Sequence, residues 1–238
     1  MGPIRGVLFD AGNTLIRVRG SVGAVYAEVA RRHGLHADAG ALEEGFRKSF
    51  RQRKEGFLQA VSRPHSPERE RAWWRGLVEE VFRDAGSRDG LRGRFDSFFE
   101  ELYREFEESR HWQTFPDVLP CLEALAARGL PLGVLSNWDS RLHPVLRGLG
   151  LTRRFRFVLT SAELGAEKPD AAIFLEGARR LGRKPAEVLY VGDLLREDVF
   201  GAARAGLRGM LLDREGSCPA PVPRIEDLRK LPAALDAA

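Results

Sequence analysis

Short apolar segments alternate with helical patterns along most of this 238-residue chain, and this alternation limits the possible folds more than any other feature. Each segment has the length of a single strand, and glycine follows several of the helical patterns, as expected at helix C-termini. Short buried strands that alternate with helices form a parallel sheet with helices on both faces. We therefore predict an α/β fold with a Rossmann-like parallel sheet. The predicted strands are Ile4–Phe9, Leu130–Leu135, Phe155–Thr160, Val188–Val191 and Leu207–Leu212, and the predicted helices span residues 117–128, 140–149, 170–181, 196–205 and 224–235.

The region from residue 17 to 112 follows a different pattern and has almost no strand signal. Apolar residues within 22–29 recur at helical spacing, and Ser66-Pro67 has the residue types of a helix N-cap and first turn. Further helices are predicted over residues 41–61 and 95–109. We therefore predict two domains, a core of residues 1–16 and 113–238 and an all-helical cap domain of residues 17–112.

Composition narrows the functional classes. No apolar run approaches the roughly 18 residues of a membrane span, and the N-terminal segment lacks the apolar core of a signal peptide. The net charge is +4, but basic and acidic residues are interleaved rather than grouped into a nucleic-acid-binding block. Cys121 and Cys218 form no disulfide framework or zinc pattern. We expect a cytoplasmic protein without nucleic-acid or membrane partners, whose mildly basic surface favours anionic small molecules.

Polar side chains follow the predicted strands at the points where ligands bind in open parallel sheets. Asp10 ends the first strand, Ser136-Asn137 follow the second, and Lys168 follows the third. Asp193 and Asp198 come after the fourth. Taken singly, each could be a turn cap, a helix cap or a surface residue. Together they bring carboxylates to one edge of the sheet, where they repel each other unless a cation such as Mg²⁺ lies between them.

The stretches around these residues occur in a recognisable order: VLFDAGNTL, SNWD, EKPDAAIF and VGDLLREDVFGA. Together they closely resemble the four motifs of the haloacid dehalogenase (HAD) superfamily, and they read like its phosphatase-type members. The resemblance covers residues 1–15 and 113–213 directly. The helical insert matches the subclass whose cap lies between the first and second motifs.

The resemblance implies a role for each matching residue. Asp10 would be the nucleophile that attacks phosphorus to form an aspartyl-phosphate, and Ser136 and Lys168 would assist by binding the phosphoryl group and neutralising charge. Thr14 would help to hold the loop and Asn137 the pocket. The implied substrate is a small phosphorylated metabolite, contacted by Thr14, Ser136, Asn137 and Lys168. The implied cofactor is Mg²⁺, bound by Asp10, the Gly12 carbonyl, Asp193 and Asp198.

Gly12 departs from the pattern, because phosphatases of this family carry there a second Asp that protonates the leaving group. Four explanations remain open. The chain could be a phosphatase that acts without this acid, a 2-haloacid dehalogenase, a phosphonatase with Lys48 or Lys54 as the Schiff-base lysine, or a binding or regulatory module with little turnover. Dehalogenases work without a metal, so the pair Asp193 and Asp198 favours the Mg²⁺-dependent phosphatase.

Overall fold

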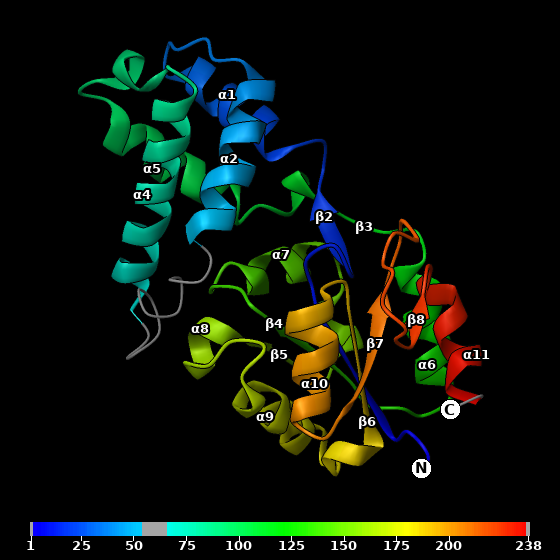
Figure 1. Cartoon of the computed structure of the whole chain (residues 1–238). Helices are drawn as coiled ribbons and strands as arrows, with labels where there is room; N and C mark the ends of the chain where they lie inside the picture. The colour runs from blue at the N-terminus through cyan, green and yellow to red at the C-terminus, as the bar shows by residue number, and fades with distance from the viewer. Residues whose placement is uncertain (1, 54–65, 237–238) are drawn as a thin grey trace. The chain divides into compact units, whose positions relative to one another are not determined.

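The computed structural model describes residues 2–53 and 66–236 (Figure 1). The chain divides into two compact units. Unit 1 comprises Met1–Arg17, Thr114–Asp139 and Leu149–Ala238, and unit 2 comprises Val18–Gln113 and Ser140–Gly148. The core of residues 1–16 and 113–238 and the cap of residues 17–112 stay a prediction; in this division residues 140–148 group with unit 2.

In the described part of unit 1, six strands form a parallel sheet in the order β5-β4-β1-β6-β7-β8. The central strands β1, β4 and β6 are buried along their whole length, which explains their continuous apolar sequences. The predicted α/β fold is therefore confirmed. The strands are β1 Gly6–Phe9, β4 Leu132–Ser136, β5 Phe157–Thr160, β6 Val188–Gly192, β7 Arg208–Leu212 and β8 Arg224–Ile225.

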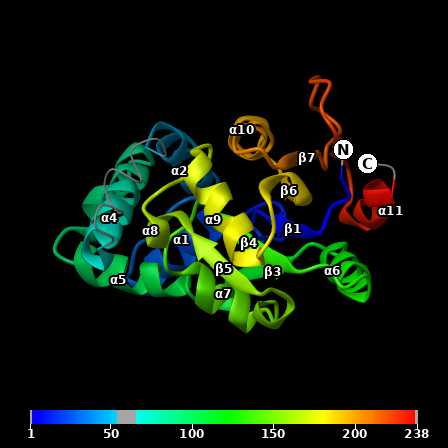
Figure 2. The ribbon, with the colours of Figure 1, turned by 90° about the horizontal axis from the view of Figure 1, so that it is seen from below.

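Helices cover both faces of this sheet (Figure 2). On one face, the Phe174 ring of α9 meets the Tyr190 ring of β6 edge-on, with 5.0 Å between ring centroids. Gly177 allows α9 to approach β1 and β4, because a Cβ there would lie 2.8 Å from side-chain atoms of both strands. On the other face lie α6 and α11. The helices of this unit are α6 Val118–Ala127, α8 Ser161–Leu164, α9 Ala171–Leu181, α10 Gly201–Arg204 and α11 Leu231–Asp236.

Two predicted helices of unit 1 begin differently in the structure. The helix predicted over residues 196–205 starts as a π-helix, Leu195–Phe200, and only then continues as α10. The helix predicted over residues 224–235 starts with β8, because the backbone at Ile225 accepts a hydrogen bond from the Asp213 N–H beyond β7. Sheet pairing with a distant segment therefore overrides the local helical pattern.

Unit 2 is helical, with a core of aromatic side chains. Tyr26 contacts the rings of Phe46, Phe82 and Phe106. Ser66 caps a helix as predicted, because its hydroxyl accepts a hydrogen bond from the Arg69 N–H. The helices are α1 Val22–Arg32, α2 Ala39–Arg53, α4 Pro67–Asp84, α5 Phe95–Glu105 and α7 Leu142–Gly148. The predicted helix over 41–61 continues outside the described residues after Arg53. Within the described ranges, no helix combines the length and apolar character needed to cross a bilayer.

The chain passes between the two units through short extended segments. β2 Ile16–Val18 pairs with β3 Trp112–Thr114 in a separate small sheet. Neither strand was predicted, because three residues are too few to show a period of two.

Candidate active site

The order of the strands brings the predicted site residues to one edge of the sheet. Asp10 follows β1, Ser136 ends β4, and Asp193 follows β6, and these three strands are neighbours. Lys168 lies in the connection between β5 and α9. Since all strands are parallel, their carboxyl ends meet at the same edge, where open α/β sheets bind ligands.

Lys168 is the centre of a buried hydrogen-bond network. Its Nζ lies 2.6 Å from Asp10 Oδ1, 2.7 Å from Asp198 Oδ1 and 2.9 Å from the Tyr190 hydroxyl. The side chain is 3% exposed, so all three ammonium hydrogens find their acceptors within the protein. Ser136 donates a further hydrogen bond of 2.8 Å to Asp10 Oδ1. Asp10 is therefore held in one orientation by two donors.

Asn137 positions the backbone of Lys168. Its Nδ2 donates to the Lys168 carbonyl at 3.0 Å, and its Oδ1 accepts from the Lys168 N–H at 2.8 Å. The Lys168-Pro169 peptide bond is cis. The following helix, predicted over residues 170–181, begins at Ala171 with Asp170 as its N-cap. Asn137 thus acts on Lys168 in this structure, and its predicted contact with substrate stays a prediction.

Three carboxylates come together beside this network. Asp10, Asp193 and Asp198 each place one oxygen within 4.8 Å of the others. Asp198 lies on the π-helix and is fully buried, and its Oδ2 accepts a hydrogen bond of 2.9 Å from the Leu194 N–H. Gly192 is required next to it, because a Cβ there would lie 2.2 Å from Asp198 Oδ2. Asp198 thus comes from a π-helix, an element that is frequent at functional sites. Its side chain leaves room only for glycine at position 192.

The charges of this cluster do not balance. Burial, together with the carboxylates of Asp10 and Asp198, raises the pKa of Asp193 from 3.8 to about 7, and Lys168 offsets this only in part. Burial also raises the pKa of Asp198. Burial opposes the charge of Lys168, but the Asp10 and Asp198 carboxylates outweigh it and raise the pKa of the ammonium. Three acids around one lysine leave excess negative charge, and the hard oxygen donors suit Mg²⁺.

The loop after Asp10 is shaped by an unusual backbone conformation and by an arginine from far along the chain. Asn13 has a φ of 53°, in the left-handed region that asparagine tolerates. Arg214, which follows β7, donates to the Asn13 carbonyl at 3.2 Å and to the Thr14 carbonyl at 2.8 Å. The same guanidinium binds both carboxylate oxygens of the buried Asp117 and stacks 3.8 Å from the Phe115 ring centre.

Thr14 is fully buried, and within residues 2–53 and 66–236 its hydroxyl has no hydrogen-bond partner. A buried hydroxyl without a partner is unfavourable by about 1–3 kcal/mol. The predicted role of Thr14 in holding the loop is therefore carried by its main-chain carbonyl, which Arg214 binds, and its hydroxyl keeps its capacity for another group.

Two side chains of this site, Tyr190 and Arg214, were not predicted from the sequence. Tyr190 donates to the Leu135 carbonyl at 2.7 Å and so presents its lone pairs to Lys168. A tyrosine inside the apolar segment VLYV was a detectable signal, since a buried hydroxyl needs partners. Arg214 gave no such signal, because its partners Thr14 and Asp117 lie 200 and 97 residues away in the sequence.

The lysines considered for a phosphonatase do not gain support. Lys48 is exposed and forms an ion pair of 2.8 Å with Asp84. The hydrogen bond and the charge of Asp84 raise the pKa of Lys48, whereas a Schiff-base lysine needs a lowered pKa to be neutral. Lys54 lies outside the described residues.

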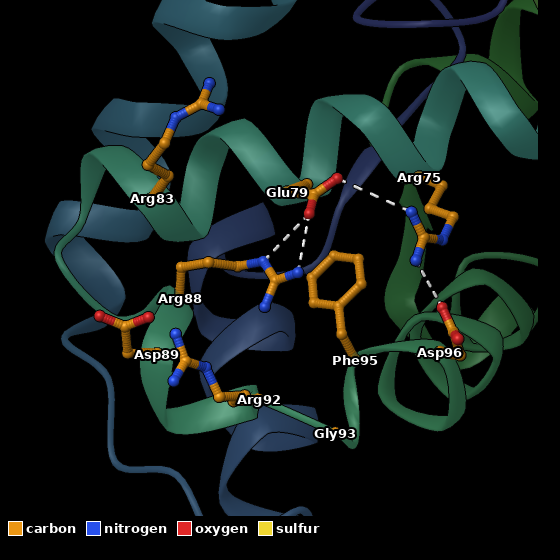
Figure 3. A pocket seen from close by; sticks show the side chains of 9 residues that line it. All are labelled: Arg75, Glu79, Arg83, Arg88, Asp89, Arg92, Gly93, Phe95 and Asp96. Carbon is orange, nitrogen blue, oxygen red and sulfur yellow. Dashed lines mark hydrogen bonds and ion pairs between the residues drawn. The ribbon is translucent and has the colours of Figure 1, made fainter.

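A surface cavity of about 460 Å³ lies in unit 2, between α4 and the start of α5 (Figure 3). Arginines gather around it, but carboxylates neutralise several of them. Arg88 and Arg75 both bind Glu79, and Arg75 also binds Asp96. None of the predicted site residues lines this cavity, so the chemistry of the carboxylate cluster, rather than the cavity, marks the candidate active site.

Comparison with known proteins agrees with the fold. The sequence profile of haloacid dehalogenase-like hydrolases matches residues 4–206. The chain is 36% identical over 213 residues to haloacid dehalogenase-like hydrolase domain-containing protein 3 of Danio rerio, covering 90% of this chain and 86% of that protein. The chain therefore belongs to the haloacid dehalogenase-like hydrolase family.

Solved structures of two different activities resemble the chain equally well. A HAD phosphatase from Thermococcus onnurineus superposes with a TM-score of 0.68 at 25% identity, over 98% of both chains. A 2-haloacid dehalogenase from Pseudomonas syringae gives the same TM-score at 26% identity, over 98% of this chain and 99% of that one. Similarity alone therefore leaves the reaction undecided, and the choice depends on the site.

Proposed function

We propose that this protein is a Mg²⁺-dependent phosphatase that hydrolyses a small phosphorylated metabolite through an aspartyl-phosphate on Asp10. The observation that carries the proposal is the cluster of Asp10, Asp193 and Asp198, with Asp193 at a pKa of about 7. A dehalogenase displaces a halide without a metal, so the excess negative charge beside its nucleophile would stay uncompensated. A phosphatase gains a binding site for the cation that accompanies a phosphate group.

Asp10 supplies the nucleophile. Hydrogen bonds from Ser136 and Lys168 both reach Oδ1, so the lone pairs of Oδ2 are available for attack on phosphorus. As the new O–P bond forms, the bond from phosphorus to the leaving oxygen breaks, and the electron pair departs with that oxygen. Water then attacks phosphorus, releases phosphate and restores the Asp10 carboxylate.

Asp10, the Gly12 carbonyl and Asp193 would hold Mg²⁺, with Asp198 binding it or orienting its waters, and the bound ion would neutralise charge on the phosphoryl oxygens. Ser136 and Lys168 both donate to Asp10 Oδ1 in the substrate-free protein, and on substrate binding they would redirect these hydrogen bonds to the phosphoryl group. Contacts from Thr14 and Asn137 to the substrate, a cytoplasmic location and the lack of nucleic-acid and membrane partners stay predictions from the sequence.

One alternative has an observation in its favour. Gly12 supplies no general acid, and such an acid typically contributes about 10² to 10⁴ in rate. A binding or regulatory module that keeps the cation site but turns over little would share this feature. It would bind Mg²⁺ and a phosphate mimic without measurable hydrolysis.

A substrate panel tests these functions. Phosphorylated metabolites, acetyl phosphate, 4-nitrophenyl phosphate and 2-haloacids are assayed with Mg²⁺ or with EDTA. If the protein is a phosphatase, it should release phosphate only with Mg²⁺. Asp10→Asn should abolish this release and still unfold in a cooperative thermal transition, which shows that the variant is folded. Beryllofluoride, which mimics an aspartyl-phosphate, should bind wild type only with Mg²⁺. Halide release in EDTA would identify a dehalogenase, and binding of beryllofluoride without turnover on any substrate would identify the module.

A further inference from the structure

Trp138 lies against the position where residue 12 would carry a side chain. A Cβ built on Gly12 would be 3.2 Å from Trp138 Cζ3 and 4.0 Å from Cε3. Trp138 comes two residues after Ser136, the last residue of β4. Gly12 comes two residues after Asp10, which follows β1, and β1 and β4 are neighbouring parallel strands. The indole ring therefore lies against the loop that follows Asp10, the proposed nucleophile.

The main chain at Trp138 is fixed on both sides. Its N–H donates to Ser161 Oγ at 3.2 Å, and its carbonyl accepts hydrogen bonds of 3.3 Å from Ser161 Oγ and from the Ala162 N–H. The residue is half-buried, so part of it faces solvent. Firm attachment and partial exposure are what a wall of a binding site requires.

The backbone of the loop does not explain the glycine. Gly12 does not have a positive φ, and Asn13 is the loop residue in the left-handed region. A larger residue at 12 therefore meets no conformational barrier. It meets the ring, because a Cβ contact of 3.2 Å is tighter than ordinary van der Waals contact, and an Asp carboxyl would extend further into the same space.

We propose that Trp138 takes the place of a side chain at position 12 and forms an aromatic wall for the leaving group, so that the site prefers aryl phosphates. The inference rests on the proposed phosphatase function. The ring offers stacking to an aromatic leaving group, with centroids 4.5–7 Å apart in favourable pairs. It offers no proton to the leaving oxygen, and a phenolate leaves without one far more readily than an alkoxide does.

A set of four proteins tests this inference by activity: wild type, Gly12→Asp, Trp138→Ala and the double variant. The ratio of kcat/KM for phenyl-type over acetyl phosphate should fall about 3- to 10-fold in Trp138→Ala, from the loss of one aromatic contact, and Trp138→Phe should restore most of it. On an alkyl phosphate, Gly12→Asp alone should gain little, whereas the double variant should gain at least about 10-fold over Trp138→Ala. An unchanged aryl-to-acetyl ratio in Trp138→Ala overturns the aromatic wall, and a full alkyl gain in Gly12→Asp alone overturns the exclusion.

A stability cycle tests the same contact without any turnover, so it separates this inference from the proposed function. Gly12→Ala adds only the Cβ. In the wild-type background it should lower the melting temperature by about 2–4 °C, the shift expected for the loss of about 1 kcal/mol in a protein of this size. In the Trp138→Ala background it should cause no loss, since the ring is gone. Equal losses in both backgrounds would show that the ring does not fill this position.

Discussion

Replacing Asp193 by asparagine should stabilise the metal-free protein while removing its capacity to bind Mg²⁺. Burial and the neighbouring carboxylates raise the pKa of Asp193 from 3.8 to about 7. An acid with a raised pKa holds its proton in the folded state at pH values where the unfolded chain has lost it, so the folded state loses stability as the pH rises from about 4 to about 7. Asparagine stays neutral at every pH and avoids this loss.

The size of the effect follows from the pKa. At about 1.36 kcal/mol for each pKa unit, the rise from 3.8 to about 7 corresponds to about 4 kcal/mol as an upper bound. Lys168 and Asp198 readjust when Asp193 ionises, so we expect about half of this, near 2 kcal/mol, at pH 8 in EDTA. The melting temperature of Asp193→Asn should then exceed that of wild type by about 4–8 °C. The difference should shrink at pH 5 and vanish near pH 4.

Thermal melts at pH 5 and pH 8, in EDTA and in Mg²⁺, provide the assay. Saturating Mg²⁺ should raise the melting temperature of wild type and leave the variant almost unchanged, because a ligand stabilises only the protein that binds it. Asp89→Asn, a change at an exposed aspartate of unit 2, is the control and should shift neither curve. If Asp193→Asn melts below wild type at pH 8 in EDTA, Asp193 is a stabilising carboxylate and the reasoning from crowded charge is wrong. Unchanged Mg²⁺ affinity by calorimetry would remove Asp193 from the metal site.

Three further changes test other contacts. Lys168→Met should lower the melting temperature by about 6–20 °C, because removing one partner of a buried ion pair costs about 3–5 kcal/mol. The control is Lys230→Met, which breaks an exposed ion pair. Equal shifts in the two variants would show that burial of the Lys168 pair does not matter. Thr14→Val should not lower the melting temperature, since the lost hydroxyl has no hydrogen-bond partner in the described chain. A raised KM for a phosphorylated substrate in this variant would indicate that the hydroxyl binds the substrate. Arg214→Lys should weaken Mg²⁺ binding by calorimetry. The guanidinium makes four hydrogen bonds, to two loop carbonyls and to both oxygens of Asp117, whereas an ammonium has three donors and cannot bind a carboxylate in this two-pronged way. An unchanged affinity would mean that Arg214 does not position the loop.

The sheet could be predicted from the sequence because its central strands are buried on both faces. Such strands must be continuously apolar, and the chain shows this at β1, β4 and β6. The short strands β2, β3 and β8 have two or three residues each, too few for any period to appear. The π-helix that carries Asp198 could not be predicted either, because the sequence of residues 196–205 has an ordinary helical pattern.

The residues of the candidate site could be named from their places after the strands, but their mutual contacts could not. That Lys168 binds Asp10, Asp198 and Tyr190 together depends on side chains up to 158 residues apart in the sequence. The absence of an acid at Gly12 was visible in the sequence. The ring that lies against this position was not, because it belongs to Trp138, in the segment that follows the neighbouring strand β4.

The hydrogen-bond network around Lys168 also explains how the folded chain accommodates the repulsion between the carboxylates of the candidate site. The buried carboxylates of Asp10 and Asp198 and the half-buried carboxylate of Asp193 repel one another, and Lys168 forms ion pairs with the two buried ones. Tyr190 and Asn137 hold that lysine by its side chain and its main chain, so its charge stays where the repulsion is greatest. In the proposed Mg²⁺ site, the remaining negative charge would attract the cation. The same imbalance that weakens the metal-free protein would then supply the affinity for the ion, and a variant that removes the imbalance should gain stability and lose that affinity together.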